Sequence, residues 1–540
     1  MLLLIFVLLI IAPALTYYVS TTLFYQTAKS TALGKEPPTI PYFVPGATHA
    51  FGLASNGQQK YFARLLKEYG NFAPFAFLWF VVLRDPEQMK KAMHACEQQN
   101  AVVTRRNMHE VILGSSEAVA KIYADAAVDK AELEVMRGVS MRKYLEGSPL
   151  ANMNNLYADL LSRNMNDKMF QVGSWTQIED VWSFFQQVLT RCSMEALFGS
   201  AIFKQYPGLI KDYWRFEDAI QGFLPVLPWF ATPRPYKEPL DRLCQGIEKW
   251  LRVNHSGTEF AKTGSDDADW DEHRGSKFIQ ERDDIVAKAM LSFETRTAEM
   301  LDIMHCSNVD LIPSSIWSII ELLRKPYLAG HVTDIVSEHK PTKTATCDVN
   351  GIISRPLFQS LQAEVSRLRI AQYMICTNPT AKVAVDSEWT LPKESNAISF
   401  SQDYALNTKV WANAPPHAVS KPLEEFWAER FLAPSKDASK AQGQRKGRDS
   451  GKETRFDAQN LELLVPAVGD KQAFGLASDY IKAMQAVTLT VLLSEFEMQL
   501  CDPDLIDAAM PELRESAFGQ VRPKDKIAVR IRKRRTGKEQ

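Results

Sequence analysis

The chain has 540 residues, of which 46% are hydrophobic and 24% are charged, a composition typical of a globular protein with a substantial core. Its 63 basic and 64 acidic residues leave a net charge of -1, so the chain as a whole gives no electrostatic case for nucleic-acid binding. The seven cysteines form no C-x-x-C pair, which argues against a zinc site and favours reduced, mostly buried thiols.

The first 28 residues are expected to form a transmembrane anchor. No charge occurs before Lys29, and about 20 apolar residues span a bilayer as a helix. A cleaved signal peptide is the alternative, although such a peptide usually has a basic start and a shorter apolar core. Because Lys29 and Lys35 follow the apolar run, we expect the body of the protein to face the cytosol. Prolines within residues 29–46 predict a short, stiff hinge.

The body, residues 47–540, begins with a helical pattern over Gln58–Tyr69 that Gly70 closes. Residues 72–83 are aromatic and β-branched, which predicts a pair of short strands. A helix is then expected over residues 84–93, where Asp85 and Pro86 take the capping positions.

Long helices are expected to dominate from about residue 116 to residue 253. Two polar segments, 256–284 and 434–459, are expected to be flexible inserts. The basic run at residues 530–535 is interpreted as a solvated tail, with attraction to an anionic membrane as the second interpretation. Helices outweigh strands throughout, so we expect one mostly α domain with small β-sheets.

Three motifs occur in the second half of the chain. Glu364 and Arg367 lie one helical turn apart and can pair, and Arg430 follows Glu429 in the stretch EEFWAERFL. Upstream of both, residues 304–326 are expected to form one long helical segment with Pro313 inside it.

In their order along the chain, these features resemble those of a cytochrome P450, and the resemblance covers essentially the whole sequence. The central helix is most similar to the branch that contains prostacyclin synthase and the sterol 7α-hydroxylases, whose filamentous-fungal members commonly serve secondary-metabolite pathways. The resemblance implies a cytochrome P450 fold and a place in the endoplasmic reticulum membrane. It also implies that Glu364, Arg367 and Arg430 form a structural charge triad that braces the haem-side loop.

The haem loop of the family, F-x-x-G-x-R-x-C-x-G, is altered in this chain. Phe474 takes the position of the haem-ligating cysteine, Gln472 that of the arginine that offsets a haem propionate, and Leu476 that of a glycine. A phenyl ring has no lone pair to replace the axial thiolate. The sequence therefore predicts that no cofactor binds, unless haem uses an atypical ligand. Tyr480, the nearest tyrosine, would require a relocated haem.

Polar groups remain on the central helix. The acid–alcohol pair of the family falls on Asp310 and Leu311, so the acid is kept and the alcohol is lost. His305, Cys306 and Asp310 are the candidate catalytic residues, an acid/base set in an apolar pocket. The alternative is a buried thiol and a hydrogen-bonded structural carboxylate.

Three functions remain open, and whether the chain is an enzyme is itself left open. The first is a haem-independent cyclase or isomerase that acts on an apolar polyketide or terpenoid in a fungal pathway. The second is a non-catalytic, membrane-held scaffold for other pathway enzymes. The third is a haem monooxygenase with an unusual axial ligand. The expected partners are an apolar small molecule, the membrane and other pathway enzymes, but no nucleic acid.

Overall fold

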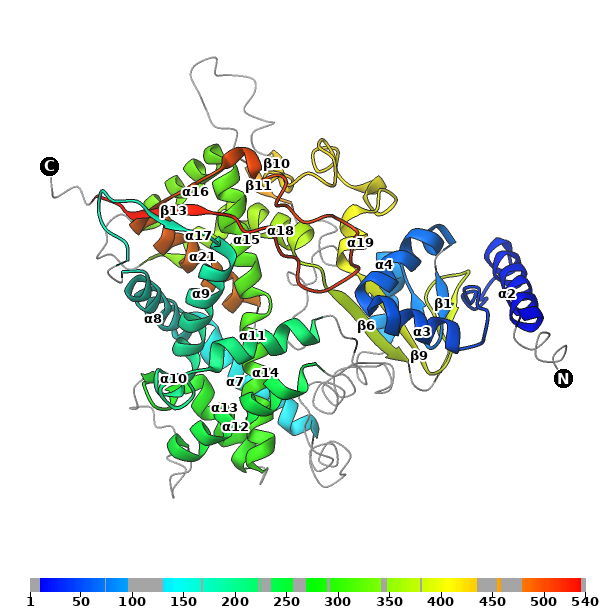
Figure 1. The fold of residues 1–540 in the computed structure, drawn as a ribbon, viewed down its shortest axis with the longest axis horizontal. Coiled ribbons are helices and arrows are strands. Elements are labelled where there is room, and N and C mark those ends of the chain that lie inside the picture. The colour runs from blue at the N-terminus through cyan, green and yellow to red at the C-terminus, as the bar shows by residue number, and fades with distance from the viewer. Residues whose placement is uncertain are drawn as a thin grey trace, which may run out of the picture.

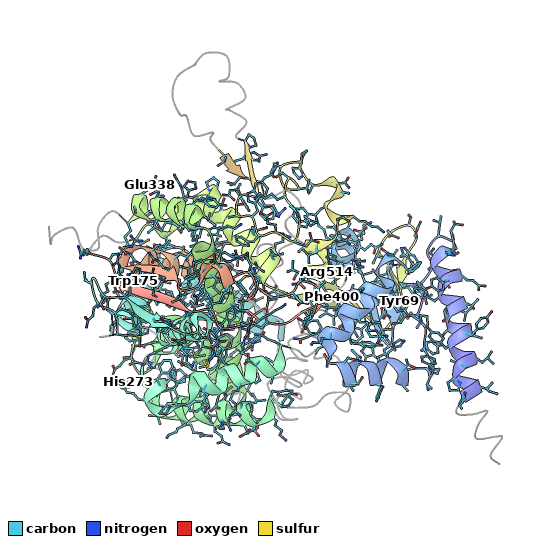
Figure 2. The ribbon with its side chains drawn as sticks, turned by 45° about the horizontal axis from the view of Figure 1, so that its top comes forward. Tyr69, Trp175, His273, Glu338, Phe400 and Arg514 are labelled. Atoms are coloured by element: carbon cyan, nitrogen blue, oxygen red, sulfur yellow. The ribbon has the colours of Figure 1, made fainter. Side chains whose placement is uncertain are left out.

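The structure is a computed structural model that describes residues 10–72, 74–95, 130–166, 169–221, 224, 235–255, 269–288, 292–340, 347–378, 381–434, 454–457 and 478–535. Figure 1 shows a large helical lobe beside a smaller lobe that carries the main sheet, with α2 at the outer edge of the smaller lobe. Figure 2 marks Tyr69 and Phe400 in the smaller lobe, and Trp175 and His273 in the helical lobe.

The helices follow one another along most of the described chain. They are α2 (Ala12–Lys29), α3 (Ala47–Asn56), α4 (Gln58–Tyr69), a helix over 86–95, α7 (Lys130–Leu145), α8 (Gly147–Met165), α9 (Val181–Phe198), α10 (Ala201–Gln205), α11 (Leu209–Ile220), α12 (Lys237–Asn254), α13 (Lys277–Lys288), α14 (Phe293–Asn308), α15 (Leu311–Arg324), α16 (Pro326–His339), α17 (Val349–Ser354), α18 (Pro356–Arg369), α19 (Ser401–Leu406) and α21 (Ser478–Glu495). Short 3-10 turns are η2 (Gly70–Phe72), η5 (Val410–Asn413) and η7 (Pro503–Leu505).

The strands are short and form small sheets. They are β1 (Phe75–Phe77), β2 (Phe80–Val82), β3 (Thr176–Ile178), β4 (Trp270–Asp271), β5 (Gly275–Ser276), β6 (Tyr373–Asn378), β7 (Val383–Ala384), β8 (Thr390–Leu391), β9 (Ser395–Phe400), β10 (Leu432–Pro434), β11 (Thr454–Phe456), β12 (Phe496–Leu500) and β13 (Val529–Lys533). The mostly helical fold with small sheets is confirmed.

The smaller lobe is built on the sheet β1-β2-β9-β6, in which β2 and β9 are parallel and the other pairs are antiparallel. Phe62 of α4 lies among aromatic rings from three other segments, Phe77, Phe400 and Phe518. Such edge-on and tilted contacts bury large apolar rings. The expected strand pair and the helix over Gln58–Tyr69 are both confirmed.

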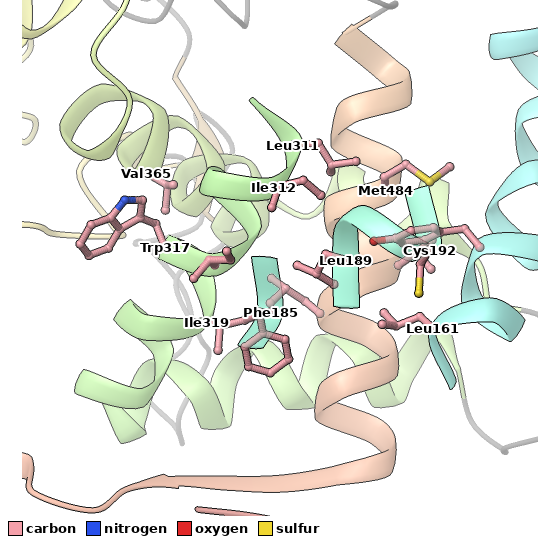
Figure 3. Packing of buried hydrophobic residues seen from close by; sticks show 14 of the residues in the cluster. Leu161, Phe185, Leu189, Cys192, Leu311, Ile312, Trp317, Ile319, Val365 and Met484 are labelled. Carbon is pink, nitrogen blue, oxygen red and sulfur yellow. The ribbon is translucent and has the colours of Figure 1, made fainter. Parts of the chain in front are cut away.

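The core of the helical lobe is centred on α15. Figure 3 shows Leu311 and Ile312 of α15 pointing toward α21, with Leu189 of α9 and Met484 of α21 beside them, and Trp317 on the opposite side of α15. All five side chains are buried. An apolar helix enclosed on several sides in this way supports the residues at its N-terminal end, where the candidate site lies.

The long central helix expected over residues 304–326 is in fact two helices, so that expectation is wrong. α14 ends at Asn308 and α15 begins at Leu311. Pro313, in the first turn of α15, has no N–H to donate, and its ring clashes with the carbonyl four residues earlier. The helical hydrogen bonding begins again at Ser314, whose N–H donates to the Asp310 carbonyl at 3.1 Å. The break therefore falls on Val309 and Asp310.

The first flexible insert is shorter than expected. Residues 256–268 lie outside the described part of the chain, but β4, β5 and the start of α13 occupy residues 269–284. Gly275 explains the tight turn between β4 and α13. Its φ of +79° favours glycine, and an added Cβ would lie 2.2 Å from the Leu197 carbonyl oxygen. Phe278 and Ile279 then enter the core.

The second insert and the basic tail are also partly ordered. β11 pairs with β10, and residues 435–453 and 458–459 of that insert lie outside the described residues. The basic run that was interpreted as a solvated tail is largely strand β13, which pairs with β12 on one side and β3 on the other. Val529 and Ile531 are buried while Arg530 between them is exposed, an alternation that was readable in the sequence.

Helix α2 covers most of the predicted anchor, whose residues 1–9 lie outside the described part. Within the described residues, no helix combines the length and the apolar character needed to cross a membrane. The second half of α2 is attached to the body. Ser20 donates to the Tyr42 carbonyl at 3.2 Å, and Phe24 packs edge-on against Tyr69 and Phe72. The hinge at residues 29–46 thus folds back along the helix that precedes it.

A buried ionic network joins α7, α13 and α14. Glu299 of α14 accepts from Arg137 of α7 and from Arg282 of α13, with the Arg282 Nη1 at 3.1 Å. Next to it, Asp283 pairs with Arg296 at 2.7 Å. All five side chains are almost fully buried. Because buried charges are stable only when they are paired and hydrogen-bonded, these contacts fix how the three helices meet.

Candidate functional site

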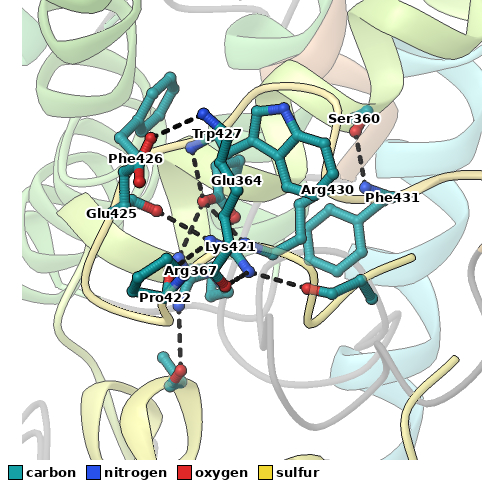
Figure 4. Close-up of polar contacts among 12 residues, drawn as sticks. Ser360, Glu364, Arg367, Lys421, Pro422, Glu425, Phe426, Trp427, Arg430 and Phe431 are labelled. Carbon is teal, nitrogen blue, oxygen red and sulfur yellow. Dashed lines mark hydrogen bonds and ion pairs between the residues drawn. The ribbon is translucent and has the colours of Figure 1, made fainter. Parts of the chain in front are cut away.

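The predicted charge triad is assembled as expected (Figure 4). Glu364 of α18 accepts from the Arg367 Nε at 2.7 Å and from the Arg430 Nε at 3.1 Å, and all three side chains are fully buried. Burial alone would raise the pKa of Glu364, but the charges and hydrogen bonds of the two arginines outweigh it and lower that pKa.

The triad holds the irregular segment that follows α19. Arg430 donates to backbone carbonyls of residues 418, 421, 422 and 425, and Arg367 donates to the Ala405 carbonyl at 2.9 Å. The Trp427 N–H donates to Glu364 at 3.0 Å. With so many backbone groups satisfied at one place, the triad is a structural brace and presents no group to a ligand.

The candidate catalytic residues lie where α11 crosses the end of α14. His305 of α14 places its Nδ1 2.8 Å from one carboxylate oxygen of Glu217 on α11 and 3.1 Å from the other. Glu217 is 0% exposed, whereas the His305 side chain keeps 18% exposure. Burial lowers the pKa of His305, but the Glu217 carboxylate more than offsets this and raises it to about 9. His305 is therefore a cation at neutral pH.

Asp310 lies at the break between α14 and α15. It takes the N-cap position of α15, yet its carboxylate caps no backbone N–H. Instead, Oδ1 accepts from the Gln372 Nε2 at 2.6 Å. Burial raises the pKa of Asp310, with Gln372 and His305 opposing the shift and Glu217 adding to it. The net effect raises the pKa of Asp310 and so shifts it toward the protonated acid, the form that can donate a proton.

The thiol of Cys306 has a different partner from the carboxyl group of Asp310. Its Sγ donates to Asp302 Oδ1, one turn earlier on α14, at 3.8 Å. Cys306 and Asp310 are four residues apart, a spacing that would place them on one face of a continuous helix, but the break at Val309 separates their turns. Tyr213 of α11 is near both, and burial first, then Glu217, raises the pKa of its phenol. Its hydroxyl donates to the Met304 carbonyl at 3.3 Å.

Two residues of this site were not predicted from the sequence. Glu217 follows the apolar Tyr213 by four residues and precedes Ile220 by three, so it lies on the buried face of an otherwise amphipathic helix. A carboxylate on such a face was a readable signal. Gln372 had no comparable signal, because its position depends on how the segment after α18 meets the central helix. Its backbone N–H donates to the Ser401 hydroxyl at 2.9 Å.

The residues of the altered loop, Gln472, Phe474 and Leu476, lie outside the described part of the chain, and their roles stay a prediction. Tyr480, the alternative ligand considered, belongs to α21 and is fully buried near Tyr157 and Ser193. Burial raises the pKa of its phenol, which opposes a tyrosinate.

The chemistry of the described donors can be tested against a haem. The cysteines in the described residues lie on or beside α9, α12, α14, α17, β6 and β12, and none of them directly precedes α21. The triad fits a haem protein of this kind, but these thiols do not supply an axial ligand at that place. Within the described residues, no group of three or more His, Cys, Asp or Glu is arranged to hold a metal ion.

The chain is similar over nearly its whole length to characterised fungal proteins. Cytochrome P450 monooxygenase fsoE of Humicola fuscoatra is 24% identical over 562 residues, which covers 98% of this chain and 95% of the relative. Cytochrome P450 monooxygenase efuG of Hormonema carpetanum is 24% identical over 559 residues, covering 98% and 96%. The similarity supports the cytochrome P450 superfamily. Cytochrome P450 monooxygenase calL of Penicillium decumbens is 25% identical over 389 residues, 70% of this chain and 67% of the relative. No family model matches the chain.

These P450 relatives overturn one expectation. The absence of any cofactor was predicted from the altered loop, and that prediction is wrong on this comparison, because cytochrome P450 monooxygenases use haem and the similarity is nearly full-length. Three changed loop positions are thus a weaker indicator of cofactor loss than the frame around them is of its retention. That frame, the triad and the helices beside it, is present in the structure.

Proposed function

We propose that this chain is a P450-like protein of fungal secondary metabolism that acts on an apolar small molecule. The proposal is supported by the relatives, which are named fungal monooxygenases, and by the order of motifs along the chain. Within that class, the described residues best support acid–base chemistry, a cyclisation or an isomerisation. The observation that carries this is Asp310, a carboxyl group with a raised pKa at a helix break, beside a cationic histidine.

The proposed reaction uses Asp310 as a general acid. Its proton is transferred to one carbon of a C=C bond or to an oxygen of the substrate, and the carboxylate then removes a proton from another carbon. One C–H bond breaks, the double bond moves or a ring closes, and the acid is restored. Gln372 holds the carboxyl by donating to Oδ1, which leaves Oδ2 as the atom that carries the proton. Apolar neighbours such as Leu311 limit competition from water.

Monooxygenation is the second candidate function, and it is favoured by the names of the relatives. When bound, a haem would supply the oxygen-activating chemistry. The alternative of a non-catalytic scaffold for other pathway enzymes has no comparable support among the described contacts.

We further propose a single-pass anchor in the endoplasmic reticulum membrane, with the body in the cytosol. Support comes from the uncharged N-terminal run and from the apolar outer face of α2, where Leu15, Tyr18 and Leu23 are exposed. Exposed apolar side chains on one helix fit the interior or the interface of a bilayer. Lys29 follows on the side expected to face the cytosol.

The test compares Asp310→Asn with the wild type in the producing fungus and in purified form. Asparagine keeps the size and the acceptor for Gln372 but has no transferable proton. We expect normal folding and loss of the pathway product, with accumulation of its precursor. Asp334→Asn is the matched control, because Asp334 is exposed on α16. Full product from Asp310→Asn would contradict the acid role. An absorbance spectrum of the purified wild type tests the second candidate, since a monooxygenase of this class requires a stoichiometric haem band.

A further inference from the structure

The pairing of His305 with Glu217 leaves one ring nitrogen of the histidine available. Nδ1 is engaged by both carboxylate oxygens of Glu217, at 2.8 Å and 3.1 Å. Nε2 has no partner among the residues that the structure describes, and the side chain keeps 18% exposure. Because the Glu217 carboxylate holds the imidazole in its cationic form, both ring nitrogens carry protons, and Nε2 presents an N–H. The site therefore holds an unused donor next to the acid Asp310.

We propose that this site binds the carbonyl oxygen of an apolar ketone or ester, that His305 donates to that oxygen through Nε2, and that Glu217 is the positioning residue that fixes the donor. This rests on the proposed function only in that Asp310 belongs to the same site.

The charges of the site select a neutral oxygen over an ionic group. Glu217 and His305 together carry no net charge, and burial raises the pKa of Asp310 toward its neutral form. A ligand carboxylate that approached His305 would also meet the buried charge of Glu217 nearby, and a ligand ammonium would meet the imidazolium. Burial of an ionic group without a compensating charge is costly. A carbonyl oxygen is an acceptor without charge, so it matches the available donors.

Glu217 acts from the neighbouring helix and has no need to touch the ligand. It joins α11 to α14, and Tyr213, one turn earlier on α11, secures the same crossing through the Met304 carbonyl. Glu217 holds Nδ1 in place and keeps His305 in the cationic form, in which Nε2 also carries a proton. Substitution by glutamine keeps a hydrogen bond to Nδ1 but removes the charge that holds the imidazole in its cationic form. The ligand oxygen would then meet a neutral imidazole whose outward nitrogen can be an acceptor.

The experiment measures binding and uses no turnover. The purified full-length protein is titrated with 2-tridecanone and with tridecane, which share a chain length and differ in one carbonyl group, and binding is followed by tryptophan fluorescence. A hydrogen bond from a charged donor contributes about 1.5–3 kcal/mol, so we expect the wild type to bind the ketone about 10- to 150-fold more tightly than the alkane. His305→Asn should reduce this ratio to nearly one.

A spectroscopic readout separates positioning from simple structural support. With carbonyl-labelled 2-tridecanone, donation from His305 lowers the infrared C=O stretching frequency in the wild type relative to its value in hexane. Glu217→Gln should weaken that shift while tridecane binds unchanged. His339→Asn is the matched control, because His339 pairs with Asp348 through Nδ1 at 3.2 Å on α16, outside this site.

Equal binding of ketone and alkane by the wild type would overturn the proposal, as would binding of neither. An unchanged infrared shift in both His305→Asn and Glu217→Gln would overturn it as well. The binding proposal and the acid role of Asp310 fail separately, because Asp310→Asn can abolish product while the ketone still binds. If His305→Asn lost its folded state, the Glu217→Gln spectra would decide the question.

Discussion

The substitution Glu364→Gln removes one charge from the buried triad and almost none of its volume. In the wild type, Glu364 accepts two hydrogen bonds from Arg367, one from Arg430 and one from the Trp427 N–H. The glutamine keeps one acceptor oxygen, but its amide group then faces guanidinium donors. Two fully buried arginines are left without an opposing charge.

Removing one partner from a buried ion pair costs about 3–5 kcal/mol, because the remaining charge stays desolvated. We expect the free energy of unfolding to fall by about that amount. At about 2 cal/mol/K of unfolding entropy per residue, a domain of roughly 500 residues loses about 1 °C of melting temperature per kcal/mol. The predicted shift is therefore about 3–5 °C by scanning calorimetry of the purified protein.

Glu425→Gln provides the matched control. Glu425 pairs with Lys421 at 2.9 Å, and both side chains are almost half exposed. Exposed pairs of this kind contribute about 0.2–1 kcal/mol, so this variant should melt within about 1 °C of the wild type. If Glu364→Gln and Glu425→Gln melted at the same temperature, the triad would not be the brace that its contacts indicate.

Three further predictions concern other parts of the chain. In urea denaturation, Gly275→Ala should lower the free energy of unfolding by about 1–3 kcal/mol, because the φ of Gly275 is +79° and the new Cβ meets the Leu197 carbonyl. The control Gly330→Ala lies on an exposed turn of α16 with open space around it, and it should raise the free energy of unfolding by up to about 1 kcal/mol. On acidification, the wild type should lose the stability contributed by Glu364 as the pH falls below the ordinary glutamate pKa of 4.5 and through the lowered pKa of Glu364 in the fold. Glu364→Gln should lack that component of the acid transition, and identical acid-unfolding curves for the two proteins would refute this prediction. Deletion of residues 1–16 should release the protein from the membrane fraction with an unchanged melting temperature. Deletion of residues 1–30 should lower the melting temperature, because the aromatic contacts of Phe24 are lost. If the protein without residues 1–16 stayed in the membrane fraction, the proposed anchor would be wrong.

The sequence predicted those parts of the fold that local chemistry decides. The aromatic, β-branched residues 72–83 formed the expected strand pair, and Asp85 capped the next helix by accepting from the Glu87 N–H at 2.9 Å. Sequence patterns failed to predict local structure where that structure depends on a contact with a distant part of the chain. Residues 269–284 are polar enough to suggest a loop, but Trp270 donates to the Glu195 carbonyl at 3.1 Å, and Gly275 lets the chain approach α9.

At the candidate site, the identities of His305 and Asp310 could be inferred from the sequence, but their relations to other elements could not. The contact of His305 with Glu217 spans 88 residues, and that of Asp310 with Gln372 spans 62. Such pairs depend on how whole helices cross, which no local pattern encodes. The break at Val309 and Asp310 could have been read from Pro313, because the clash of a proline ring with the preceding turn is a local effect.

The buried network of Arg137, Arg282, Glu299, Asp283 and Arg296 constrains how this sequence can change over time. A neutral residue in place of Glu299 would leave two arginines facing each other in the interior, and loss of Arg296 would leave Asp283 without its strongest cation. Single steps in either direction pass through a less stable protein. Among proteins that share this network, substitutions at these five positions should therefore occur in compensating sets, so that α7, α13 and α14 vary together.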